Sequence, residues 1–125
     1  MILNRDHFTL KIAETEVELV AAQRLRYRVF VEEMGARPAF HSVMKQETDA
    51  FDPYFDHLVL KDSRINDERE NVVGVYRLMR GDIAAAGPGF YSAGEYDLSK
   101  ISATGRRVVE LGRSCLDAHY RGGLA

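Results

Sequence analysis

The chain begins with a strand pattern followed by a helix pattern. Residues His7–Ala13 alternate apolar and polar side chains, which predicts a half-buried strand. From Glu16 to Met34 apolar side chains recur every three or four positions, as in an amphipathic helix. Thr15 is the expected N-cap, because its hydroxyl can accept from the first free backbone N–H groups. Gly35 is expected to end the helix.

Two further apolar runs, Phe55–Asp62 and Asn71–Arg80, flank the polar stretch Ser63–Glu70. Both runs are rich in valine and leucine, and the polar stretch between them is typical of a turn. The pattern predicts an antiparallel hairpin. Gly74 inside the second run indicates a bulge or the close approach of another backbone.

The segments between these elements are less regular. Residues Arg37–Tyr54 show no sustained period and contain two prolines, which predicts a long loop of the kind that often carries function. We expect one helical turn at Asp82–Ala86, extended chain at Phe90–Leu98 and a short helix at Ser99–Thr104.

A last strand is expected within Arg106–Gly123, where it starts at Val108. Successive side chains alternate between the faces of a strand. Glu110 would therefore lie opposite Arg113 and Cys115 unless a bulge intervenes, and bulges recur beside active sites. A structural ion pair and a functional site remain open as interpretations. The order of elements predicts a mixed α/β fold with a largely antiparallel sheet.

Composition limits the class of protein. The 125 residues suffice for one domain, residues 1–125, and the net charge of −2 gives no general attraction to nucleic acid. One cysteine is compatible with a reducing compartment, so we expect a cytoplasmic protein. We expect no signal peptide and find no apolar run long enough to span a membrane, although peripheral membrane association stays open.

Several charged residues are candidates for chemistry. The long loop contains Glu47, Asp49 and Asp52, which could hold an amine or could simply be solvated. Arg77 lies in line with apolar neighbours on its strand, so we expect it to pair with a carboxylate.

The predicted helix carries a row of arginines, namely Arg24, Arg26 and Arg28. Such a row is usually a solvated helix face, and a site for an acidic partner is the less common alternative.

Two further residues carry weaker signals. Cys115 has no neighbouring histidine in the sequence and is expected to be a small buried apolar residue rather than a nucleophile. His57 is expected to make a structural hydrogen bond. No Cys/His cluster indicates a metal site.

Six segments, taken together and in this order, resemble the N-acyltransferases of the Gcn5-related superfold, specifically the ornithine-lipid branch (L-ornithine Nα-acyltransferases). They are LRYRVFVEEMGA (Leu25–Ala36), TDAFD (Thr48–Asp52), DHLVL (Asp56–Leu60), VVGVYRL (Val72–Leu78), FYSAGEYDLS (Phe90–Ser99) and VVELGRSCL (Val108–Leu116). The acyl-homoserine-lactone synthases are close relatives. The resemblance implies a twisted sheet that splays open around an acyl thioester, with flanking helices, and a chain that continues past Ala125.

The resemblance also implies site residues. Glu110 and Arg113 would be catalytic, with Glu110 as the general base. The substrate-binding residues would be Arg26, Phe30, Asp49, Asp52 and Arg77. Arg121, Gly122 and Gly123 would bind the acyl carrier and its phosphopantetheine, although HYRGGL matches the superfold's phosphate-binding motif only loosely. The lactone synthases carry a tryptophan after the first helix, and this chain has none.

The implied reaction transfers a (3-hydroxy)acyl group from acyl carrier protein to the α-amine of ornithine, the first step of ornithine lipid synthesis. The carrier's phosphopantetheine thioester would be the donor, with no resident cofactor and no metal. Two alternatives stay open. One is an acyl-homoserine-lactone synthase, which would consume S-adenosylmethionine. The other is an inactive acyltransferase part that serves only as a binding module.

Overall fold

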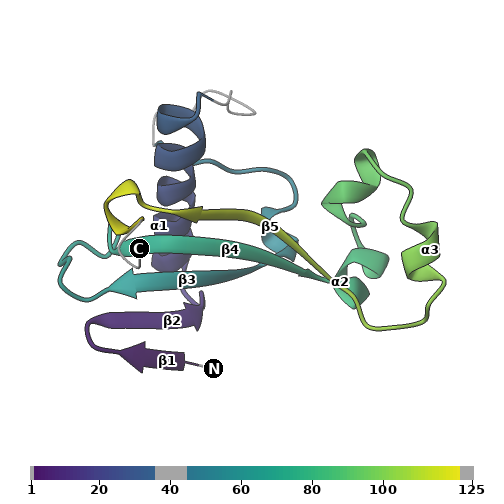
Figure 1. Ribbon diagram of the computed structural model, residues 1–125, viewed down its shortest axis with the longest axis horizontal. Helices are drawn as coiled ribbons and strands as arrows, with labels where there is room; N and C mark the ends of the chain where they lie inside the picture. The colour runs from purple at the N-terminus through teal and green to yellow at the C-terminus, as the bar shows by residue number, and fades with distance from the viewer. Residues whose placement is uncertain (1, 36–44, 122–125) are drawn as a thin grey trace.

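A single antiparallel sheet forms the centre of the computed structural model, which describes residues 2–35 and 45–121. Its five strands lie in sequence order, each paired with the next (Figure 1). They are β1 (Ile2–Arg5), β2 (Phe8–Ile12), β3 (Asp56–Asp62), β4 (Val72–Arg80) and β5 (Val109–Leu116). The predicted class, mixed α/β with a largely antiparallel sheet, is confirmed.

The predicted hairpin is present as β3 and β4, and the strand predicted at His7–Ala13 is present as β2. The outer strand β1 is an addition that the sequence pattern did not indicate. It turns back onto β2 through Asp6, whose φ of 54° lies in the left-handed region that aspartate tolerates. Gly74 allows a close approach, because a Cβ there would meet Leu116 Cδ1 at 3.1 Å and Leu60 Cβ at 3.3 Å.

One long helical segment crosses the sheet, as Figure 1 shows. Helix α1 (Glu16–Arg26) begins with the predicted cap at Thr15, and Glu18 completes a capping box by bonding back to the Thr15 backbone. The chain continues without a break as a π-helix, Tyr27–Glu33, which the sequence did not predict. Gly35, at φ 76°, follows its end as expected.

Two hydrophobic clusters lie on the face of the sheet that α1 covers. The larger lies between α1 and the strands and includes Leu25, Val29, Val59 and Val75. The smaller lies at the other end of β4 and consists of Phe55, Met79 and Ala84 with their half-buried neighbours. On the opposite face of β3 and β4 the side chains of Leu58, Leu60, Tyr76 and Leu78 are only half-buried.

The chain between β4 and β5 forms a separate lobe beyond the strand ends (Figure 1). It contains α2 (Gly81–Ala86), a 3-10 turn (Tyr91–Gly94) and α3 (Ser99–Ser102). The helical turn and the short helix were predicted. The extended chain predicted at Phe90–Leu98 is wrong, because the Glu110 carboxylate accepts the backbone N–H groups of Tyr91 and Ser92 and stabilises a turn there. Two further 3-10 turns are Asp52–Tyr54 and Ala118–Tyr120.

A bulge in β5 changes which side chains share a face. The register pairs Val75 with Cys115 but Arg77 with Gly112, so Arg113 and Ser114 together oppose one residue of β4. Arg113 has φ 51°. Strict alternation would have placed Arg113 and Cys115 on the face opposite Glu110. That expectation is wrong because the bulge, which was named as the exception, is present. All three lie on the side of the sheet that α1 covers.

Among the described residues, no helix is long and apolar enough to cross a membrane. Within the same residues, no group of three or more metal-ligating side chains could hold a metal ion.

Candidate active site

A network of charged side chains lies between the two hydrophobic clusters. Arg77 projects from β4 on the same face as Val75 and Met79, one from each cluster. Arg77 is 1% exposed, and its guanidinium stacks on the Phe55 ring with Cζ 4.0 Å from the centroid. A buried arginine must be neutralised to be tolerated, which explains what surrounds it.

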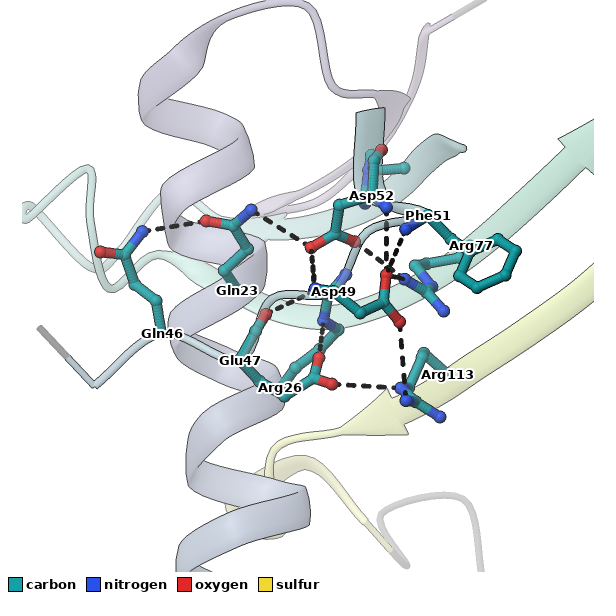
Figure 2. A network of polar contacts seen from close by, with 10 residues as sticks. Gln23, Arg26, Gln46, Glu47, Asp49, Phe51, Asp52, Arg77 and Arg113 are labelled. Atoms are coloured by element: carbon teal, nitrogen blue, oxygen red, sulfur yellow. Dashed lines mark hydrogen bonds and ion pairs between the residues drawn. The ribbon is translucent and has the colours of Figure 1, made fainter. Parts of the chain in front are cut away.

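Asp52 is the centre of the network (Figure 2). Its Oδ1 accepts from Arg77 Nη1 at 2.9 Å, and its Oδ2 accepts from Arg26 Nη2 at 2.7 Å. Gln23 Nε2 also donates to Oδ2, at 3.4 Å. Both carboxylate oxygens are therefore occupied by protein donors.

Local geometry fixes Asp52 in place. Asp49 Oδ1 accepts the backbone N–H groups of Phe51 and Asp52 at 3.0 and 3.1 Å, a turn typical of aspartate. Pro53 then starts the short 3-10 turn, where a missing N–H costs nothing. The loop acids thus reach the sheet because Asp49 folds the loop back on itself.

Three arginines face three carboxylates in this network. Arg26 contacts Glu47 (Nε to Oε2, 2.7 Å) as well as Asp52, and Arg113 contacts Glu47 Oε1 at 3.3 Å. The charges balance, as a buried cluster requires. Burial by itself would raise the pKa of Asp52, but hydrogen bonds and charge from Arg26 and then Arg77 outweigh it and lower that pKa.

Exposure rises along the network from the core to the surface. The side chains of Arg26, Arg77 and Asp52 are 0%, 1% and 6% exposed. Asp49 reaches 16% and Arg113 reaches 29%. Asp49 Oδ2 is buried and accepts no hydrogen bond among the described residues, and it lies 3.7 Å from Arg113 Nη2. The outer end of the network therefore has one accessible guanidinium and, beside it, a buried acceptor that has no hydrogen-bond partner among the described residues.

Aromatic rings frame this outer end. The Arg113 guanidinium lies 5.3 Å from the centroid of the Tyr91 ring and 5.9 Å from that of Phe30. Phe51 packs edge-on against Tyr91 at 5.2 Å. The π-helix carries Phe30, so this irregular helical turn shapes the site, as π-helical turns often do.

Glu110 anchors the lobe to β5. Its Oε1 accepts from the Tyr91 backbone N–H at 2.8 Å, and its Oε2 accepts from the Ser92 backbone N–H at 2.8 Å and from the Ser92 hydroxyl. A carboxylate has about four lone-pair sites, so one site on Oε1 is left. The bulge brings Glu110 and Arg113 to the same aromatic residue, Tyr91.

His57 and Cys115 have the structural roles expected. His57 Nε2 lies 3.1 Å from the carbonyl oxygen of Asp52, and burial lowers the pKa of the imidazole. Burial raises the pKa of Cys115 to about 12, so its thiol is not a nucleophile at neutral pH.

Arg121 lies at the far end of β5, apart from this network. It donates to the Leu116 carbonyl oxygen at 2.8 Å and pairs with Glu33. With Phe30 and Cys115 it lines a surface cavity of about 590 Å³. Gly122 and Gly123 lie outside the described residues.

The basic row predicted on the first helix is not one surface. Arg24 and Arg28 both pair with Glu70, and Arg28 also reaches Asp117 at 3.7 Å. Arg26 is on the core side instead. It follows Ala22 by four positions and precedes Val29 by three, a spacing that identifies a buried position.

Three contributors to the site were not among the site residues expected. Glu47 was noticed only as a loop acid, yet it joins Arg26 to Arg113. Gln23 lies one turn before Arg26, so its place on the core face could have indicated it. Nothing in the sequence indicated Ser92, because its contact with Glu110 depends on the fold of the lobe.

Comparison with known proteins places this geometry in a family. The acetyltransferase (GNAT) domain family matches residues 25–125. An L-ornithine N(alpha)-acyltransferase of Rhodobacter capsulatus is 47% identical over 120 residues, covering 94% of this chain and 46% of the relative. One of Agrobacterium fabrum is 48% identical over 115 residues, covering 89% and 39%. The chain thus spans less than half the length of these curated relatives.

The fold has a match among solved structures. The AHL synthase LasI superposes with a TM-score of 0.57 at 18% identity, covering 95% of this chain and 58% of that one. The predicted resemblance to the ornithine branch, and the expected Gcn5-related fold, are confirmed by these matches. On the family match over residues 25–125, the chain belongs to the acetyltransferase (GNAT) domain family.

Proposed function

We propose that the protein is an N-acyltransferase that moves an acyl group from a thioester to the α-amine of ornithine. The observation that carries this proposal is the identity of 44–48% to four relatives named L-ornithine N(alpha)-acyltransferase. The alignments cover 89–90% of this chain for three of these relatives and 94% for the fourth. The expected cytoplasmic location is part of the same proposal.

The outer end of the charged network suits an amino acid. A free amino acid carries an ammonium and a carboxylate close together. Asp49 is our candidate partner for an ammonium group, which would reach the buried and unbonded Oδ2 by displacing the side chains that cover it. Arg113 is our candidate partner for the carboxylate, since a guanidinium binds it through two parallel N–H groups. Phe30 would pack beside them.

The inner residues of the network then have a positioning role. Asp52 has both oxygens occupied, and Arg26 and Arg77 are buried. We therefore propose that these three residues hold Asp49 and Glu47 in place rather than contact the substrate.

Glu110 is our candidate general base, through the lone pair left on Oε1. The ammonium gives up a proton, its nitrogen attacks the thioester carbonyl carbon, and a C–N bond forms as the C–S bond breaks. Of the two protons that the nitrogen loses, one goes to the leaving thiolate and one to solvent. Backbone N–H groups at the Arg113 bulge, where the ladder is interrupted, are candidate donors to the oxyanion.

The acyl donor is proposed to be acyl carrier protein with its phosphopantetheine thioester. The cavity lined by Phe30, Cys115 and Arg121 supports this part of the proposal, because Arg121 in its wall directly precedes Gly122 and Gly123 in the sequence. Arg121 would meet a phosphate group there, in place of its present pair with Glu33.

A second candidate is acyl-homoserine-lactone synthesis, which the fold match to LasI favours. The discriminating experiment supplies the complete protein with acyl carrier thioesters and offers ornithine, lysine and S-adenosylmethionine in parallel. Mass spectrometry should find an acylated ornithine. An acyl-homoserine lactone would establish the second candidate. If no amine gave a product, the remaining interpretation would be an inactive protein that serves only as a binding module.

A further inference from the structure

The lobe contains an arginine-lined cavity that the proposed reaction does not use. Arg80, Arg106 and Arg107 line a surface cavity of about 590 Å³ where β4 ends and β5 begins. A hydrogen bond of 2.7 Å from the Gly81 N–H to the Val108 carbonyl oxygen joins the two ends of this segment beside the cavity. The cavity belongs to the segment between two adjacent strands, and none of the charged-network residues lines it.

The cavity carries a surplus of positive charge. Arg106 and Arg107 are exposed, and neither guanidinium has a carboxylate partner among the described residues. Arg80 has only distant ones, Asp56 at 3.7 Å and Asp82 at 4.0 Å. Asp82 is the one acid in the cavity wall as described. Three guanidinium groups against two carboxylates, Asp56 and Asp82, leave a positive surplus that favours a phosphate, which accepts several of their N–H groups at once.

Apolar side chains surround the same cavity. Phe90, Val108 and Val109 belong to its wall and also to the wall of a second, smaller cavity of about 180 Å³. Ile101 lines that second cavity. Ile101 is 48% exposed and Val109 is 52% exposed, so both face solvent beside the arginines. Cationic and apolar groups on one surface are typical of contact with an anionic bilayer.

We propose that this lobe docks on an anionic lipid bilayer, with one phospholipid phosphate held by Arg80, Arg106 and Arg107. Ile101 and Val109 would then enter the interfacial region. The lobe also has three exposed acids, Asp82, Glu95 and Asp97. They would repel an anionic bilayer, so the attraction to lipid would be limited to the cavity. A concave site takes a single headgroup, whereas an acidic protein helix would need a broader basic face. Lipid docking of the lobe goes beyond the proposed function. Vesicle binding is measured without acyl transfer, so its result does not depend on the proposed reaction.

The test is flotation of the complete protein with vesicles. Vesicles of equal parts phosphatidylglycerol and phosphatidylcholine should carry the protein, and phosphatidylcholine alone should not. The double variant R106Q/R107Q should lower the partition coefficient roughly thirty-fold, which corresponds to about 1 kcal/mol per basic residue at such a surface. Salt should weaken wild-type binding, since screening shortens the reach of surface charges.

Matched variants separate the cavity from general charge. R5Q/R69Q removes two exposed arginines far from the cavity in sequence and should bind like the wild type. I101S should bind less than I2S, which changes another exposed isoleucine. Circular dichroism checks that each variant folds. The proposal would be overturned if R106Q/R107Q and R5Q/R69Q lost vesicle binding equally, or if the wild type did not float with the anionic vesicles. Binding of inorganic phosphate or acyl carrier protein through Arg106 and Arg107 without vesicle binding would overturn the lipid assignment.

Discussion

Arg77 and Asp52 form an ion pair of 2.9 Å with almost no access to water, the arginine side chain being 1% exposed and the aspartate 6%. The pair joins a strand to a loop that precedes it by 25 positions. Removing one partner of such a pair costs more than the pair contributes, because a buried charge is left uncompensated.

The variant D52N should therefore be strongly destabilised. Both Arg26 and Arg77 would lose their shared carboxylate, and the free energy of unfolding should fall by about 3–5 kcal/mol. Urea denaturation followed by circular dichroism measures this. D67N, in the exposed β3–β4 turn, is the control and should change stability little. Equal midpoints for D52N and D67N would show that the network contributes nothing to folding.

Glu110 can be tested as a base separately from its role as an anchor. E110Q should abolish most acyl transfer, because it removes the proton acceptor. S92A removes only the hydroxyl donor to Oε2 and should keep most activity. Rates for the two variants, measured with saturating thioester, decide the point. If S92A loses as much activity as E110Q, Glu110 acts only by holding the lobe.

Glu18 should make stability depend on pH in the acid range. Burial opposes its ionisation, but bonds from the Glu14 N–H, Lys11 and Lys61 lower its pKa from 4.5 to about 2. A group with a lowered pKa stabilises the fold above the unfolded value, and this stability is lost as pH falls from 4.5 towards 2. E18Q should show less of this loss than wild type in urea titrations. E16Q, at an exposed position in the same turn, should behave like wild type.

Cys115 should be unreactive in the folded protein. A pKa of about 12, against 9.0 for a free thiol, lowers the thiolate fraction at neutral pH roughly a thousand-fold. Alkylation by iodoacetamide, followed by intact mass, should be slow until the protein is unfolded in urea. C115A should retain acyl transfer. Rapid alkylation without urea, together with an inactive C115A, would indicate a nucleophile.

Local patterns predicted much of this fold. Thr15 and Gly35 delimit the helix correctly because caps depend on a few neighbouring residues. The two apolar runs that flank the polar stretch Ser63–Glu70 predicted the β3–β4 hairpin for the same reason. The π-helix at Tyr27–Glu33 has no such local signature and was not predicted.

The site was predictable only in part. That Arg77 pairs with a carboxylate followed from its apolar strand neighbours, but that its partners would be the loop residues Asp49 and Asp52 did not. The turn at Tyr91 was not predictable, since it depends on Glu110, which lies 19 positions later. The bulge at Arg113 could be stated only as a condition, because register is set by packing across β4 and β5.

The position of the new amide bond tests the proposed acylation of the α-amine. The complete protein is incubated with an acyl carrier thioester and ornithine labelled with heavy nitrogen at the α position, and the product is fragmented by tandem mass spectrometry. The proposed function predicts that the acyl-bearing fragment contains the heavy nitrogen. Acylation of the side-chain nitrogen, or no acylated ornithine at all, would contradict it.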